Sequence, residues 1–393
     1  MNTLTAFGFS TATAAALQAS DVKAADSDQV PISIDHSGDS IVMVDADWYD
    51  HLERTRDTFE EIKQAWLPPQ GHRYNSRNNK NKDEYDDVLG VFISAGKGNE
   101  NPHIIVSIDQ ESDTKDETRR NIPERRDGSR IEVEEMSKEK ELAVNHTDCN
   151  DKEVSDPSNM PGGVRIRFAG RDGYGTLTSR VVDGDYDYNY SLATAAHVIS
   201  RDQDECGDDL LGTNAYHRGN YIGEVVDIDH DLDMVIIHNS SDYGQPIPEV
   251  WNPSDHSDRW GPIWETLSKD GVDHWIHNDR RVWKYGVSTC YTTGYVDSRG
   301  NTERAYNYSG PGPDISTECA DYWYNCVRWG EFGSIEAGDS GSITFGAHPN
   351  RNVFLACNIN SWRWSSYSDG EYSAGPAGYA WQGKHSYWWK ENA

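Results

Sequence analysis

Three short segments, far apart in the chain, constrain its fold more than any other feature. The first is an apolar run, Ser191–Val198, that ends in small residues around His197. In the second, Asp233 leads directly into the apolar run Met234–Ile237. The third is a serine between glycines, in Gly338-Asp339-Ser340-Gly341. Short apolar runs beside glycine and polar residues are typical of strands and turns, so we expect strand ends and a tight turn to meet.

These segments carry the side chains that a serine hydrolase needs. A packed histidine at a strand end suits a general base, and a buried carboxylate holds one tautomer of its ring. Glycine beside serine leaves backbone N–H groups free to bind an oxyanion. We predict that His197, Asp233 and Ser340 form a catalytic triad, with the amides of Gly338 and Ser340 as the oxyanion hole. Asp231 is the alternative to Asp233, which is preferred because Asp231 would put a charge at an inward position.

The three candidate residues follow one another as His, Asp and Ser, with Thr-Ala-Ala-His ending at His197 and Gly-Asp-Ser-Gly around Ser340. In these features the chain resembles the chymotrypsin-like (trypsin-like) serine proteases of the bacterial or haloarchaeal type. Subtilisin-like enzymes place the aspartate first and α/β-hydrolases place the serine first, so the order excludes both. The resemblance implies an all-β fold of two antiparallel β-barrels, with His197 and Asp233 from the first and Ser340 from the second. It implies a serine endopeptidase that forms an acyl-enzyme and uses no cofactor or metal.

The same resemblance places the substrate-binding residues. Ser334, six residues before the nucleophile, lies where trypsin-type members carry an acid, so selection for Lys or Arg is not expected. Ser361, Trp362 and Arg363 resemble the strand that pairs with the substrate backbone, and Ser361 would support Asp233. Arg363 replaces a glycine that leaves the pocket open, so it narrows the pocket or offers it a positive charge. An apolar substrate side chain is expected first and an acidic one second.

Two departures from the family pattern matter for function. The Ile-Val-Gly-Gly N-terminus, which pairs with the acid beside the nucleophile, is absent, so an internal arginine is expected to balance Asp339 as in bacterial-type relatives. The narrowed pocket beside Arg363 keeps a second hypothesis open, a catalytically silent protease-like binding protein. Turnover of any peptide or ester substrate separates the two hypotheses.

Residues 1–160 precede the resemblance, which covers 161–393. Apolar residues at helical spacing from Trp48 to Trp66 predict a helix that ends before Pro68-Pro69. We expect a small α+β unit followed by an acidic linker, and it is either a propeptide that assists folding or an accessory binding domain. Its expected strands are Val88–Ile93, His103–Ile108 and Arg130–Val133.

Acidic residues outnumber basic ones, and this limits the kinds of partner that the protein can bind. The chain contains 66 Asp and Glu against 36 Lys and Arg, for a net charge of −30. Such a surface repels nucleic acid and anionic membranes, and no stretch is apolar enough to span a membrane. Because the chain still has the apolar residues needed for cores, we interpret the acidity as adaptation to high salt, which screens self-repulsion. The expected partners are protein or peptide substrates, and the expected state is a monomer.

Six cysteines and four Asn-x-Ser/Thr sequons favour an extracellular or cell-surface location, although Leu4–Leu17 lacks the basic start of a signal sequence. Cys319 and Cys326 are close enough to close a local disulfide loop. The Trp-rich end from Trp381 is expected to pack as a C-terminal helix. The acids of Asp183–Asp187 lack the Gly and Glu of a calcium loop, so a turn is favoured there.

Overall fold

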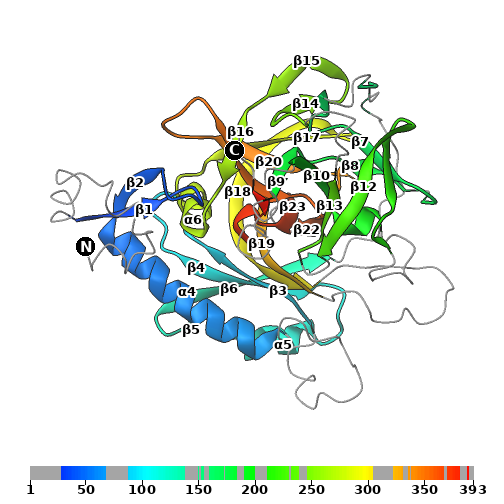
Figure 1. Ribbon diagram of the computed structural model, residues 1–393. Helices are drawn as coiled ribbons and strands as arrows, with labels where there is room; N and C mark the ends of the chain where they lie inside the picture. The colour runs from blue at the N-terminus through cyan, green and yellow to red at the C-terminus, as the bar shows by residue number, and fades with distance from the viewer. Residues whose placement is uncertain are drawn as a thin grey trace.

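A computed structural model of the chain describes residues 28–67, 87–137, 149, 152–154, 159–171, 173–183, 190–199, 210–229, 232–238, 246–303, 322–330, 335–336, 338–366, 370–380 and 387–388. These residues are mostly β, with few helices and two large sheets (Figure 1). The predicted predominance of strands is therefore confirmed. No helix in these ranges has the length and apolar character needed to cross a membrane.

The first large sheet has eight strands in the order β24-β9-β10-β13-β12-β11-β7-β8. Because β8 and β9 are close in sequence yet lie toward opposite ends of this order, the sheet curves back around its own core of Leu192, Ile236 and their neighbours. Its strands are β7 (Arg165–Phe168), β8 (Gly175–Thr176), β9 (Arg180–Asp183), β10 (Tyr190–Thr194), β11 (Asn214–His217), β12 (Asn220–Asp229), β13 (Met234–His238) and β24 (Tyr387–Trp388).

The second large sheet has twelve strands, drawn from both ends of the chain. Its main order is β16-β21-β20-β17-β18-β19-β23-β22-β6-β4-β3, with β5 (Arg125–Arg126) paired to β6. The other strands are β3 (Val88–Ser94), β4 (His103–Asp109), β6 (Ser129–Ser137), β16 (Ile263–Thr266), β17 (Arg281–Gly286), β18 (Cys290–Glu303), β19 (Tyr322–Gly330), β20 (Ile343–Ala347), β21 (Phe354–Ile359), β22 (Trp362–Ser366) and β23 (Gly370–Pro376).

Two small hairpins and several helical segments lie outside the two large sheets. The predicted first helix is confirmed as α4 (Ala46–Trp66), which begins at Asp45, where the carboxylate accepts from the Trp48 amide at 2.9 Å. The remaining elements are β1 (Gln29–Ser33), β2 (Ile41–Asp45), α5 (Lys115–Asn121), the 3₁₀ turn η3 (Ala196–Val198), β14 (Val250–Asn252), β15 (Asp255–Trp260) and α6 (Lys269–His277).

The N-terminal strands are built into the second sheet rather than forming a sheet of their own. The three predicted strands are confirmed as β3, β4 and β6, but β3 also pairs with β18 and β6 pairs with β22. Seven strands therefore form a closed ring, in which each pairs with the next in the order β3, β18, β19, β23, β22, β6 and β4, and β4 pairs with β3. Gly300 makes the approach possible, because a Cβ there would lie 2.1 Å from the Val91 carbonyl oxygen. Residues on both sides of position 160 therefore share one sheet.

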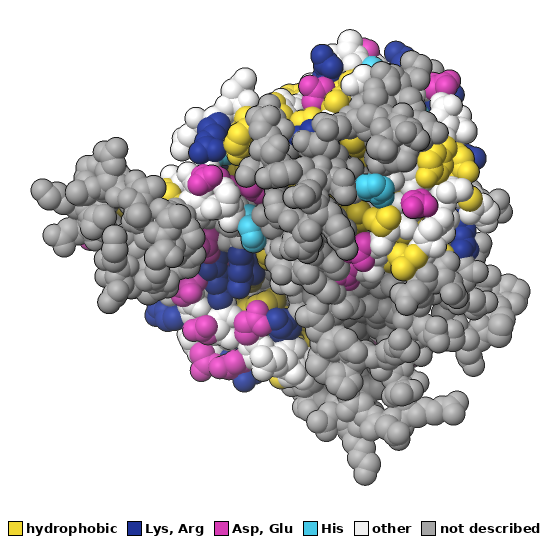
Figure 2. All heavy atoms as spheres, viewed as in Figure 1, with side chains coloured by type: hydrophobic (Ala, Val, Ile, Leu, Met, Phe, Trp, Pro, Cys, Tyr) yellow, Lys and Arg dark blue, Asp and Glu magenta, His cyan; other side chains and the backbone are white. Residues whose placement is uncertain are grey.

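One hydrophobic core and two buried ion-pair groups also cross this boundary. Apolar residues of α4, β3 and β4 pack in the same core as residues of α6, β18 and β19. Arg56 of α4 and Arg299 of β18 both bind the fully buried Asp273 of α6. Arg328 of β19 binds Glu134 of β6 inside the ring. Figure 2 shows acidic and basic side chains side by side at lower left, over the region where Figure 1 places the N-terminal unit.

The expected C-terminal helix is wrong where the tail is described. Residues 387–388 form β24, which pairs antiparallel with β9. Without this strand β9 would be an edge strand, with unpaired backbone N–H and C=O groups, and an extended tail satisfies them where a helix would not.

Candidate active site

His197 lies where β10 ends and gives way to η3. The small residues Ala195 and Ala196 are fully buried, so the chain turns tightly against β13. The Ala196 amide donates to the Asp233 carbonyl at 3.1 Å, and Thr194 of β10 lies opposite Val235 of β13. Adjacent antiparallel strands therefore bring His197 and Asp233 together, as their sequence context predicts.

Both carboxylate oxygens of Asp233 bind His197. Its Oδ2 lies 2.8 Å from the ring Nδ1, and its Oδ1 accepts from the His197 backbone amide at 2.9 Å. The carboxylate is 1% exposed, whereas the His197 side chain is 22% exposed. Because an ionised carboxylate only accepts, Nδ1 carries the proton, and in the neutral ring Nε2 is left as the base. Asp231, the alternative, lies outside the described residues.

Ser340 lies in a tight turn that packs directly against the segment before His197. Its carbonyl accepts from the Thr176 amide of β8 at 2.7 Å. Gly341 has φ +91°, and a Cβ there would lie 2.0 Å from Thr194 Oγ1 and 3.0 Å from the Ala195 amide nitrogen. Only glycine fits both the conformation and the space. The serine turn and the histidine turn are thus in contact through residues adjacent to each.

Gly338, the candidate oxyanion-hole residue, also has a backbone conformation that favours glycine, with φ +98°. Its carbonyl accepts from Thr176 Oγ1 at 2.8 Å, which points that oxygen toward the interior. A Cβ at this position would lie 2.5 Å from Ser288 Oγ and 2.6 Å from the Tyr174 ring. The turn from Gly338 to Gly341 is therefore held at both ends by contacts with β8 and its neighbours.

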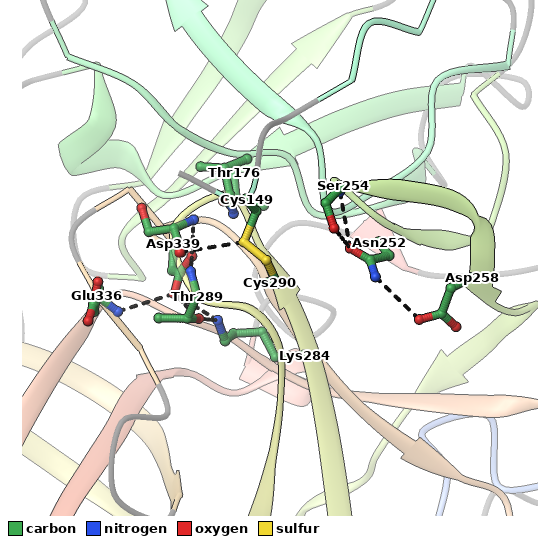
Figure 3. The surroundings of a disulfide bond; sticks show 12 residues. Cys149, Thr176, Asn252, Ser254, Asp258, Lys284, Thr289, Cys290, Glu336 and Asp339 are labelled. Carbon is green, nitrogen blue, oxygen red and sulfur yellow. Dashed lines mark hydrogen bonds and ion pairs between the residues drawn. A yellow bond between two sulfur atoms is a disulfide. The ribbon is translucent and has the colours of Figure 1, made fainter. Parts of the chain in front are cut away.

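A lysine, rather than the expected arginine, balances Asp339. Lys284 of β17 donates to Asp339 Oδ2 at 2.8 Å, and both side chains are completely buried (Figure 3). Burial lowers the pKa of Lys284 below its ordinary value, although the neighbouring Asp339 acts in the opposite direction. The sequence signal for this residue is a lysine in the otherwise apolar run from Val282 to Tyr285, and the sequence analysis missed it.

Four further donors complete the surroundings of Asp339. Oδ1 accepts from the Ser288 amide at 2.8 Å and from the Thr289 amide at 3.2 Å. Oδ2 accepts from Thr289 Oγ1 at 2.5 Å and from the Glu336 amide at 3.1 Å. A buried carboxylate needs such donors to replace its hydration. The residue before the candidate nucleophile is therefore fixed from several directions.

The expected support of Asp233 by Ser361 is wrong. Within the part of the chain that is described, the buried Ser361 hydroxyl has no hydrogen-bond partner. Its amide instead donates to the Ala374 carbonyl of β23 at 3.0 Å, which directs this segment along β23. Trp362 and Arg363 begin β22 as predicted, but their side chains lie outside the description, and so does Ser334.

The cysteines pair differently from the local loop that the sequence suggested. Cys149 and Cys290 form a disulfide. Cys326 is a buried thiol, and burial raises its pKa well above the ordinary value, so the predicted loop from Cys319 is not closed by a disulfide. Spacing alone could not find the pair that forms, because it is separated by 141 residues.

Comparisons with known proteins give only distant structural similarity. No family model and no curated protein matches the chain. Among solved structures, the Nocardiopsis protease NAPase is 13% identical, with a TM-score of 0.39, over 58% of this chain and 97% of that one. Cellulomonas bogoriensis chymotrypsin is 14% identical, with a TM-score of 0.41, over 60% and 100%. Thermobifida fusca protease A is 15% identical, with a TM-score of 0.38, over 58% and 97%.

Proposed function

We propose that the chain is a serine endopeptidase with His197, Asp233 and Ser340 as its catalytic triad. The observation that carries the proposal is the hold of Asp233 on His197 by two hydrogen bonds, directly beside the glycine-flanked serine turn. In the described ranges no group of three or more His, Cys, Asp or Glu side chains is arranged to bind a metal ion.

The proposed reaction is acyl transfer to the serine and then to water. Ser340 Oγ attacks the scissile carbonyl carbon while His197 Nε2 takes its proton. The amides of Gly338 and Ser340 hold the oxyanion that forms. His197 then returns the proton to the amine as the C–N bond breaks, leaving an acyl ester on Ser340. A water molecule, activated in the same way by His197, releases the acid and regenerates the serine.

The proposed fold for this activity has two β-barrels that meet at the triad. The first is the eight-stranded sheet, which carries His197 and Asp233. For the second, β21, β20, β17, β18, β19 and β23 pair in that order, and we propose that the ring closes between β21 and β23, where Asn358 and Ala377 form an isolated bridge. We propose that Ser361, Trp362 and Arg363 line the substrate groove, with Ser334 at the pocket, and that the pocket prefers an apolar side chain.

Labelling with a fluorophosphonate probe in molar salt tests the proposal, because the probe reacts only with an activated serine nucleophile. The full chain should be labelled, Ser340→Ala should not be, and Asp233→Asn should lower the rate by about 10⁴-fold because the histidine tautomer is wrong. Correctly folded full chain that shows no Ser340-dependent labelling would refute the enzyme and favour a silent, protease-like binding protein.

We further propose that the N-terminal unit, residues 28–137, remains part of the active enzyme. The shared ring of strands, the common core and the Asp273 ion pairs support this role over that of a removable propeptide. A chain that begins at Pro161 should therefore fail to fold and to react with the probe. Stable folding and full labelling of that shortened chain would show instead that the unit is dispensable.

Extracellular location, peptide substrates and action as a monomer are also part of the proposal. The Cys149–Cys290 disulfide supports an oxidising environment, since such bonds persist mainly outside the reducing cytosol. The high negative charge supports function in concentrated salt.

A further inference from the structure

The Cys149–Cys290 disulfide lies next to the residues that hold Asp339 (Figure 3). Three of the donors to Asp339 come from two residues, Ser288 and Thr289. Together with Val287 they form the three-residue connection between β17 and β18, and Cys290 follows them directly. The position of this connection therefore determines whether the acid beside Ser340 keeps these three hydrogen bonds.

Cys149 holds both ends of that connection. Its sulfur is bonded to Cys290 at one end, and its backbone amide donates to the Val287 carbonyl at 3.2 Å at the other. The amide of Val287 in turn donates to Thr176 Oγ1, the hydroxyl that donates to the Gly338 carbonyl. A continuous chain of contacts thus runs from the disulfide to Gly338 and Asp339, the two residues that precede Ser340.

Cys290 has a backbone conformation that needs such a restraint. Its φ is +56°, in the left-handed region that residues other than glycine rarely adopt. Strained conformations of this kind persist where the surrounding structure fixes them. With the disulfide removed, the residue can relax, and Ser288 and Thr289 would move with it, away from Asp339.

The restraint comes from outside the catalytic part of the chain. Cys149 precedes residue 161, and Lys152 and Val154 are hydrogen-bonded to the hairpin of β14 and β15 and to β11, respectively. The Lys152 amide donates to the Pro253 carbonyl at 2.8 Å, and the Val154 amide donates to His217 Nε2 at 3.1 Å. The described residues that follow Cys149 are thus hydrogen-bonded to two other parts of the fold, and this supports a role for Cys149 in holding the turn in place.

We propose that the Cys149–Cys290 disulfide, with Ser288 and Thr289, positions the Ser340 turn for acylation, so that reduction of the disulfide switches the enzyme to a low-activity state. The proposal rests on the proposed protease function. Ser288 and Thr289 are positioning residues, since they act on Ser340 through the residues that precede it, Asp339 above all. Reduction requires an external dithiol, which is oxidised to its own disulfide as Cys149 and Cys290 become thiols.

The test measures fluorophosphonate labelling of the full chain as a function of probe concentration, which separates the limiting rate from the probe affinity. A Cys149→Ser/Cys290→Ser variant should label at least tenfold more slowly at saturation, with the half-saturating concentration changed less than twofold. Dithiothreitol should slow the wild type equally and leave this variant unchanged. Near-ultraviolet circular dichroism and the urea midpoint verify that each protein is folded during labelling.

A double-mutant cycle distinguishes positioning from a general effect on stability. Thr289→Val removes one donor to Asp339 and should also slow saturated labelling while the disulfide is intact. If the disulfide acts through Thr289, the combined variant should be scarcely slower than the slower parent. Effects that multiply, or unchanged labelling of folded disulfide-free protein, overturn the proposal.

Two further outcomes are also decisive. If the serine variant does not fold, Thr289→Val and brief reduction of the folded wild type carry the test, and normal saturated labelling in both overturns the proposal. Wild-type protein without Ser340-dependent labelling would refute the protease function itself. Normal wild-type labelling together with insensitivity to the disulfide would refute only this inference.

Discussion

Replacing Asp273 by asparagine should lower the free energy of unfolding by about 3–5 kcal/mol, the usual cost of breaking a buried ion pair from one side. Its carboxylate is completely buried and accepts from Arg299 Nε and Nη2, both at 2.7 Å, and from Arg56 Nε at 3.1 Å. Arg299 is 3% exposed and Arg56 is 11% exposed. The substitution therefore leaves buried Arg299 without its carboxylate partner and leaves Arg56 with only Asp270 and Glu53.

The pH dependence of this cost has a definite sign. Burial alone raises the pKa of Asp273, but Arg299 and Arg56 outweigh it, so the net shift is downward. A carboxyl with a lowered pKa stabilises the fold above its unfolded pKa of about 3.9, and this contribution disappears as the pH falls through the folded value. The loss caused by Asp273→Asn should therefore be complete and constant through the neutral range.

Urea denaturation followed by tryptophan fluorescence measures the difference, with unchanged slopes as the condition for comparing the proteins. Glu53→Gln is the matched control, because Glu53 binds the same Arg56 but its side chain is 49% exposed. It should cost less than about 1 kcal/mol. A loss below about 1 kcal/mol for Asp273→Asn, equal to the control, would refute the conclusion that this site joins the N-terminal unit to the sheet.

Two further substitutions test the turn around Ser340. Gly341→Ala should abolish probe labelling, because its Cβ would overlap Thr194 Oγ1. Gly212→Ala is the control: Gly212 also has a positive φ, +76°, but open space around it, so this variant should label normally. Equal labelling of the two variants would contradict the packing argument. Labelling of the wild type should decline as rising pH neutralises Lys284, starting below the ordinary lysine pKa of about 10.4. Lys284→Arg keeps the charge and should move this decline to higher pH, and an unmoved decline in the folded variant would assign it to another group.

The elements predicted correctly are those whose signal is local. The helix from Ala46 to Trp66 repeats apolar residues at helical spacing, and β3 and β4 are short apolar runs. The proximity of His197 to Asp233 was also predictable. His197 follows one apolar strand and Asp233 precedes another, and antiparallel pairing of these strands puts the two residues at the same end. Chemistry and strand polarity together were enough for this part of the candidate site.

What the sequence did not reveal depends on contacts between distant segments. Nothing in β3 indicates that it pairs with β18, and the glycine that permits this, Gly300, is an ordinary strand glycine in sequence. Lys284 was missed because a lysine is rarely buried without an acidic partner, and its partner Asp339 can be identified only in the fold. Cys290 gave no sign of its partner for the same reason. Each of these features needs the fold before it can be identified.

The placement of charges connects stability with the proposed high-salt environment. At about 1 M salt the screening length is roughly 3 Å, so exposed pairs such as Arg119–Glu135 contribute little there. Pairs formed by Asp273 and by Lys284 are enclosed by protein and are screened much less. The contacts that join the N-terminal unit to the sheet, and those that fix Asp339 beside Ser340, are both of this enclosed kind. Salt can therefore relieve the repulsion among surface acids without weakening the ion pairs on which the proposed active site depends.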